Sequence, residues 1–360
     1  MLLAEQARPA PGASFADVSR RAAQAREANQ TGEAIRLYRS AIQLRPGWSE
    51  GWWYLATLLY EADRYPDARD AFRRFLRLAP DSGPGHALLG LCLYQTGDYN
   101  AALRSLLRAD ELRFGGNPEI ANAARYRMIL LLTRAGQFDE ALGLLARYAE
   151  SYSGTEPPFE TAGLAALRKP LVPDQVPAPD REFIAAVGRA VWDTFTRHPR
   201  EAEQQYRSLI AEHPRSPYLH FLYGAFLLAG SKPDEAKAEF TAELEIDPNH
   251  VPALVEIAVM ALSAGDLDGA RPYAERAVAA GPRSFAAHIA MGRVEMRSGA
   301  TARAILHFEA ARDLAPASPD ARYALAEAYR IAGRTGDALR EMAEFDRLKA
   351  RAGGPGSSGR

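Results

Sequence analysis

The sequence is poor in cysteine and lysine, and it has no long apolar run. Its one cysteine, Cys92, can form neither an intramolecular disulfide nor a metal site with other cysteines. Because Cys92 lies in the apolar run 88–93, we expect its thiol to be buried and to pack as a small hydrophobe. No apolar stretch approaches the ~20 residues that span a bilayer, so we expect no membrane-spanning helix.

An excess of charge of one sign is also missing. Lysine and arginine total 44 and aspartate and glutamate total 45, which gives a formal net charge of -1. Such a chain has no broad field that would attract nucleic acid or an anionic membrane. Basic doublets such as Arg73-Arg74 stand among acidic residues and are a weak nucleic-acid signal. We therefore expect no nucleic-acid partner.

The motifs of common active sites are absent from the sequence. It has no phosphate-binding loop, dinucleotide-binding fingerprint or serine nucleophile elbow. None of its seven histidines has a histidine or a carboxylate four residues away, as a zinc-binding helix requires. His86, His220 and His288 occupy the same place of their respective segments, so we expect a structural role for them. We predict no catalytic residue, no metal and no cofactor, and hence no enzyme.

The first residues give little information about the compartment. Met1 to Glu5 lack the basic region and the long apolar stretch of a signal peptide, and residues 1–14 are expected to be an exposed leader. The sequence as it stands favours the cytoplasm. An export signal upstream of this start would instead favour the periplasm or secretion, so the compartment stays open.

Prolines recur at a constant interval and divide the chain into segments. Because proline is poorly tolerated inside a helix, each one marks the end of one helix before the next begins. Twelve residues before each proline stands an alanine, and eight residues before it stands a large side chain in all cases but one, which places both on one helix face. The prolines with a 34-residue step are Pro46 and Pro80, then Pro214, Pro248, Pro282 and Pro316.

A turn with glycine precedes the alanine place in six units of the repeat. We expect the glycine to end the preceding helix by adopting a positive φ. The preceding helix carries a small residue after a large one, as in Leu89-Gly90 and Met291-Gly292, which lets paired helices approach closely. The turn glycines are Gly32, Gly97, Gly136, Gly265, Gly299 and Gly333.

These features together resemble the tetratricopeptide repeat family, with its 34-residue period and its pattern of Trp, Leu-Gly, Tyr, Ala, Phe, Ala and Pro. The second segment carries Trp52, Leu55-Ala56, Ala68, Phe72 and Pro80 in that order. About nine units fit, over most of residues 15–348. The resemblance implies an all-α fold, a right-handed superhelical α-solenoid of helix-turn-helix repeats.

The repeat is interrupted once by a proline-rich segment. We expect a first array of about four repeats over 15–152, a connector over 153–180, and a second array of about five repeats over 181–350. One short helix, 159–167, fits inside the connector, whose prolines exclude longer regular helix. The Gly/Ser-rich tail 351–360 is expected to be disordered.

In this family the first helix of each unit lines the concave face, so the resemblance implies a groove there. The alternative is that these side chains pack between repeats or are scattered on the surface. A carboxylate-binding groove is rejected for the first three units, because the matching places hold no basic or amide side chain. The candidate groove residues are Trp53, Tyr60, Leu91, Tyr94, Tyr126, Leu130, Tyr218, Phe221, Val255, Val259, Ile289 and Tyr323.

The resemblance implies a non-catalytic scaffold or adaptor that binds peptides or helical segments of partner proteins in this groove. The alternative is a non-catalytic partner subunit of a cell-envelope enzyme or of a secretion or assembly system. The partner, the process and the oligomeric state are not determined by the sequence.

Overall fold

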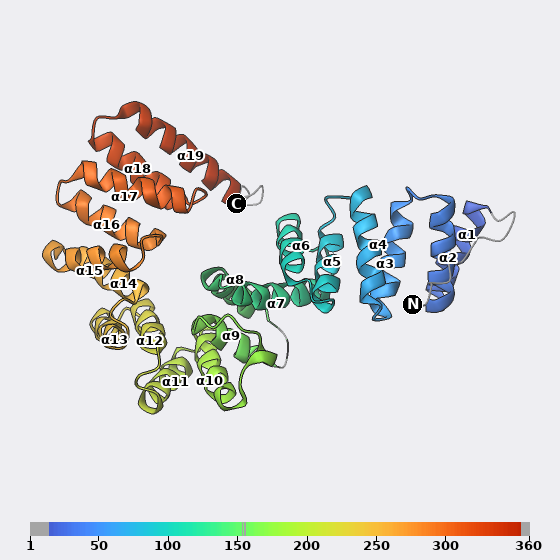
Figure 1. Ribbon diagram of the computed structural model, residues 1–360, viewed down its shortest axis with the longest axis horizontal. Coiled ribbons are helices and arrows are strands. Elements are labelled where there is room, and N and C mark those ends of the chain that lie inside the picture. Colours follow the sequence, from blue (N-terminus) through green and yellow to red (C-terminus); the bar gives the residue numbers. More distant parts are fainter. Residues whose placement is uncertain (1–13, 153, 155, 354–360) are drawn as a thin grey trace, which may run out of the picture. The chain divides into compact units, whose positions relative to one another are not determined.

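The computed structural model describes residues 14–152, 154 and 156–353, and all regular elements in these ranges are helical (Figure 1). The predicted all-α fold is therefore confirmed for this part of the chain. No helix in it is long and apolar enough to cross a membrane. The chain divides into two compact units, Met1–Ala202 and Glu203–Arg360, which we describe separately.

The first unit begins with four helix pairs and continues through the proline-rich segment. Ser14 caps the first helix by accepting a hydrogen bond from the Asp17 amide. The pairs are α1 (Phe15–Glu27) with α2 (Thr31–Leu44), α3 (Ser49–Glu61) with α4 (Tyr65–Leu78), α5 (Gly83–Gln95) with α6 (Tyr99–Leu112), and α7 (Pro118–Arg134) with α8 (Phe138–Glu150). They are followed by α9 (Phe159–Ala166), the 3-10 helix η1 (Pro173–Gln175) and α10 (Ala178–Phe195).

Helix α11 (Pro199–Glu212) runs across the division, and four further pairs make up the rest of the second unit. The last helix extends three residues into the predicted tail, and the remainder of that tail lies outside the described residues. The pairs are α12 (Leu219–Ala229) with α13 (Pro233–Ile246), α14 (Val251–Ser263) with α15 (Leu267–Ala280), α16 (Phe285–Arg297) with α17 (Thr301–Leu314), and α18 (Pro319–Ile331) with α19 (Thr335–Gly353).

The turn inside each pair contains one left-handed residue at a fixed place of the repeat. Five of the six glycines predicted for this role have φ between 74° and 80°. The prediction for Gly32 is wrong, because Gly32 lies within α2 and Asn29 takes the positive φ instead. Asparagine and aspartate tolerate this conformation better than other residues with a Cβ. The left-handed residues of the turns are Asn29, Asp63, Gly97, Gly136, Ser231, Gly265, Gly299 and Gly333.

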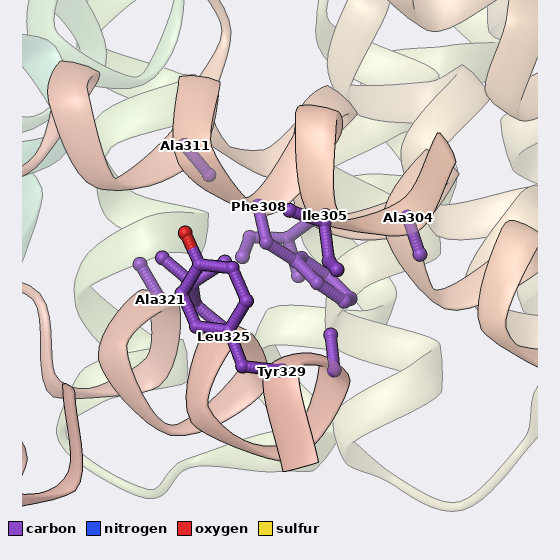
Figure 2. Packing of buried hydrophobic residues seen from close by; sticks show 9 residues of the cluster. Ala304, Ile305, Phe308, Ala311, Ala321, Leu325 and Tyr329 are labelled. Carbon is purple, nitrogen blue, oxygen red and sulfur yellow. The ribbon is translucent and has the colours of Figure 1, made fainter. Parts of the chain in front are cut away.

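The core of each pair is built on the alanine and aromatic places of the repeat. The alanines at the fixed place before each spaced proline, from Ala34 to Ala304, are all fully buried. The aromatic place is buried as well, and Phe308 of α17 lies against Leu325 and Tyr329 of α18 (Figure 2). A Cβ at Gly292 would overlap the Phe308 ring, so this glycine permits the close approach that its position predicted.

The predicted structural role of three histidines has a definite form. Nε2 of His86, His220 and His288 each donates to the carbonyl oxygen of the proline six residues earlier, at 2.9, 3.1 and 3.1 Å. At the same place Trp52 donates to Pro46 and Arg322 donates to Pro316. In these five repeats a side-chain donor therefore satisfies the carbonyl of the proline that follows the second helix.

The proline-rich segment is folded onto the first unit. The short helix expected at 159–167 is α9, which packs against α7, α8 and α10. A Cβ at Gly163 would overlap the Ile184 carbonyl, and one at Gly188 would overlap the Phe159 carbonyl. The two glycines thus let α9 and α10 cross in backbone contact. Helices α9 and α10 both belong to the first compact unit. The array boundaries at 153 and 180 stay a prediction.

Candidate functional site

Three tyrosines form a row on the first helices of the first unit. Tyr60 and Tyr94 stand one repeat apart on α3 and α5, and each meets a second tyrosine of its own pair at ring-centroid distances of 5.7 and 5.5 Å. The Arg127 guanidinium lies 4.6 Å from the Tyr94 ring centroid and 5.1 Å from that of Tyr126. Such cation–π contacts orient the rings while leaving them half-exposed.

The other candidate residues of the first unit are engaged in packing. The Trp53 ring is half-buried against Phe72 and Phe75, at centroid distances of 5.9 and 5.2 Å. Leu91 and Leu130 are buried, with 5% and 2% of their surfaces exposed. Cys92 beside them is fully buried, and burial raises the pKa of its thiol to about 12, as the predicted inert role requires.

The Tyr126 end of the row is covered by the chain itself. The Tyr126 hydroxyl lies 3.5 Å from the Thr161 hydroxyl of α9, and the two residues line a hollow of about 520 Å³ together with Pro157 and Pro158. Tyr152 lines the same hollow and donates a hydrogen bond to the Glu156 carbonyl. The connector therefore covers the surface next to Tyr126 that a segment of a partner protein would need.

The second unit has a larger hollow on the side of its first helices. It measures about 860 Å³ and is formed by α16, α18 and α19, with Phe308 of α17 at its base. The Tyr323 and Phe345 rings meet at 5.5 Å, and 52% of Tyr323 is exposed. Lys349 places its ammonium 5.3 Å from the Phe345 ring centroid. An aromatic floor with charged residues at its edge is typical of a protein-binding site.

A second hollow of about 650 Å³ adjoins the first and extends it to α14. Four residues line both hollows: Arg293, Met296, Tyr323 and Glu327. The extension adds Val259 and Leu262 of α14 and the exposed Ile331 of α18. We call the two together the second-unit hollow. It crosses three successive first helices, of which α14 and α16 are in direct contact.

The candidate residues of the second unit are divided between this surface and the core. Val259 and Tyr323 line the second-unit hollow, whereas Val255 and Ile289 are buried at 7% and 8% exposure. Phe221 packs on the Phe240 and His250 rings at 5.7 and 5.1 Å, and Tyr218 packs on His250 at 4.4 Å. Phe221 and Tyr218 thus contribute to the contact between successive helix pairs.

Sequence reasoning missed the charged residues of the hollow. Arg293 stands one repeat after Val259, at the same groove place of the next unit, and Arg297 stands one turn later. The 34-residue period points to Arg293, but basic side chains were considered only at the groove places of the first three units. Neither arginine forms an ion pair with a described residue, although most arginines of the last two pairs do.

Two buried carboxylates were also missed, and both serve structure. Glu243 is fully buried and accepts hydrogen bonds from the Tyr218 and Phe221 amides at 2.7 and 3.2 Å. Burial raises the pKa of Glu243 above its ordinary value, although the two hydrogen bonds act in the opposite direction. Glu295 is buried too, yet Arg271 and Arg303 at 3.0 Å keep its pKa below the ordinary value despite desolvation. Among the described residues no three His, Cys, Asp or Glu side chains are grouped as metal ligands would be.

Comparison with known proteins settles the family. Two family models described as tetratricopeptide repeat match the chain, one over residues 25–92 and the other over 196–251, 227–285, 255–319 and 289–355. The matches cover more than half of the sequence. The chain belongs to the tetratricopeptide repeat family. This confirms the resemblance on which the groove prediction was based.

The individual proteins similar to this chain are distant. NPGR1 of Arabidopsis thaliana is 33% identical over 98 residues, which are 27% of this chain and only 14% of that protein. The structure of MamA 41-end from Desulfovibrio magneticus RS-1 is 19% identical to this chain, and the match covers 46% of this chain and 93% of the MamA chain with a TM-score of 0.41. Yeast Tom70 is 12% identical over 93% of this chain and 92% of its own, also at 0.41.

Proposed function

We propose that this tetratricopeptide chain is a non-catalytic scaffold that binds a segment of a partner protein in the second-unit hollow. The observation that carries the proposal is the exposed aromatic and aliphatic surface there, since Tyr323 and Ile331 each leave half of their area in solvent. Contiguous apolar surface of this kind marks interaction sites in folded proteins. Membership of the tetratricopeptide family supports a protein as the partner.

The test compares two exposed apolar side chains of the second unit. Tyr323→Ser removes a side chain from the hollow, and Leu306→Ser removes one from α17 that is 65% exposed outside it. We expect the tagged full chain carrying Tyr323→Ser to capture its partner from a lysate of the source cells at least about tenfold less well, as expected for an aromatic anchor. Leu306→Ser should match wild type. Equal capture by both variants would refute the proposal.

We propose a second, smaller surface for the exposed sides of Tyr60 and Tyr94 in the first unit. It is supported by their regular spacing and by the half-exposure of both rings. Trp53 and Tyr126 contribute less to it, because Trp53 packs on Phe72 and Phe75 and the connector lies against Tyr126.

A further inference from the structure

The second-unit hollow carries uncompensated positive charge at its edge. Arg293 and Arg297 are one turn apart on α16, so their like charges repel, and neither has a carboxylate partner among the described residues. The two acidic residues that line the hollow already have favourable interactions. Glu327 accepts a hydrogen bond from Arg330 Nε at 3.0 Å. Asp320 lies in the first turn of α18, where the helix dipole stabilises its charge. Carboxylates from outside would therefore find two unpaired guanidinium groups side by side.

The described residues of the lining also lack the amide side chains that both donate to and accept from an extended backbone. An extended segment that enters an apolar hollow buries amide and carbonyl groups, and each needs a partner from the wall. No asparagine or glutamine is among the described residues that line the second-unit hollow. Its one serine, Ser263, already donates to the Val259 carbonyl of its own helix. A helical segment satisfies its own backbone and needs only apolar contact from such walls.

We propose that the second-unit hollow binds an amphipathic helix of a partner protein, with its apolar face against Met296, Tyr323 and Phe345 and with acidic side chains paired to Arg293 and Arg297. Because the two arginines are one turn apart, the ligand presents two carboxylates three or four residues apart along one edge of its apolar face. This inference rests on the proposed function and adds the conformation and the charge of the bound segment.

The experiment uses the full chain and three labelled, end-capped synthetic peptides of about 18 residues. The first has leucines at helical i, i+3, i+4 and i+7 spacing, flanked by glutamates. The second has lysine at every glutamate, and the third keeps the glutamates but has a central proline, which breaks the helix. Fluorescence anisotropy gives the Kd of each at low and at physiological salt.

We expect the acidic helix to bind on the order of tenfold more tightly than the lysine peptide at low salt, because two exposed ion pairs replace two repulsive contacts. The advantage should shrink as salt rises, and the proline peptide should lose binding. Arg293→Glu should reverse the preference between acidic and basic peptides. Arg283→Glu, the same charge change at an exposed site outside the hollow, should leave it unchanged.

The outcomes separate this inference from the proposed function. Equal Kd values for the acidic and lysine peptides, or full binding by the proline peptide, would overturn the acidic helix as ligand. If those peptides still lose affinity with Tyr323→Ser, the hollow remains a binding site. Absence of binding by all three peptides would overturn the inference, and the capture experiment with Tyr323→Ser then decides the proposed function by itself.

Discussion

At the residue scale, one place of the repeat has a common task that different residues perform. Tryptophan, histidine and arginine all stand six residues after the proline and donate to its carbonyl. Where Leu254 occupies the place and has no donor, Arg276 donates to the Pro248 carbonyl instead, at 2.8 Å. The requirement is therefore for a hydrogen-bond donor, which accounts for the recurrence of histidine at this place.

His220 adds a pH dependence to this task. Its Nδ1 lies 2.6 Å from Glu239, and this hydrogen bond raises the pKa of His220 above its usual 6.5, against the effect of burial. A raised folded-state pKa contributes stability that is complete below the unfolded value and is lost as pH rises through the folded value. We predict that His220→Gln costs about 1–2 kcal/mol of unfolding free energy near pH 6 and less near pH 9.

Urea denaturation at the two pH values measures the difference between wild type and variant. Repeating it in a Glu239→Gln background supplies the control, because the pH-dependent part of the difference should vanish without the carboxylate. If the loss of unfolding free energy caused by His220→Gln stayed constant or grew with pH, the charged imidazolium of His220 would contribute nothing to stability.

At the element scale, the period predicts most helices but not how they meet outside the repeat. Alanine recurs at its place in every unit, and an aromatic residue and a proline recur at theirs in most units, so their roles could be read from Pro46 to Pro316. The crossing of α9 and α10 has no repeat to reveal it, since Gly163 and Gly188 matter through the backbone of the opposite helix, at Ile184 and Phe159. Likewise the period located the groove places but not the exposure of the side chains there. Trp53 is half-buried because it packs on Phe75, whereas Tyr323 is exposed. Such contacts with neighbouring helices cannot be read from one segment of sequence.

The α9–α10 crossing is open to a direct test. Gly188→Ala places a methyl group where the Phe159 carbonyl lies, so the helices must separate, and we predict a loss of about 3 kcal/mol or more in the stability of the first unit. Gly143→Ala in α8 is the matched control: its Cβ meets nothing within 4 Å, and alanine should stabilise the helix by about 0.5–1 kcal/mol. Thermal unfolding followed by circular dichroism measures both. Destabilisation of equal size in the two variants would contradict the crossing.

At the scale of the whole molecule, contacts pass from each pair to the next within each compact unit. Helix α4 packs on α5, α15 on α16 and α17 on α18, while first helices also touch the first helices of adjacent pairs, as α5 touches α7. In such an array stability is nearly a sum of local terms. A disturbance in one compact unit should therefore remain within it.

Two phenylalanines at the same repeat place test this locality. Phe72 in the first unit and Phe308 in the second are both almost fully buried, eight residues before a proline, and each change to alanine should cost about 3–5 kcal/mol. Hydrogen exchange followed by mass spectrometry should show Phe72→Ala speeding exchange in α3 to α6 and leaving residues 219–331 at wild-type rates. Phe308→Ala should do the converse, with faster exchange in α16 to α18. Each variant is the control of the other, because the chemical change is identical and only the unit differs. Faster exchange throughout the chain in either variant would mean that the two compact units unfold as one, and the second-unit hollow could then respond to events in the first unit.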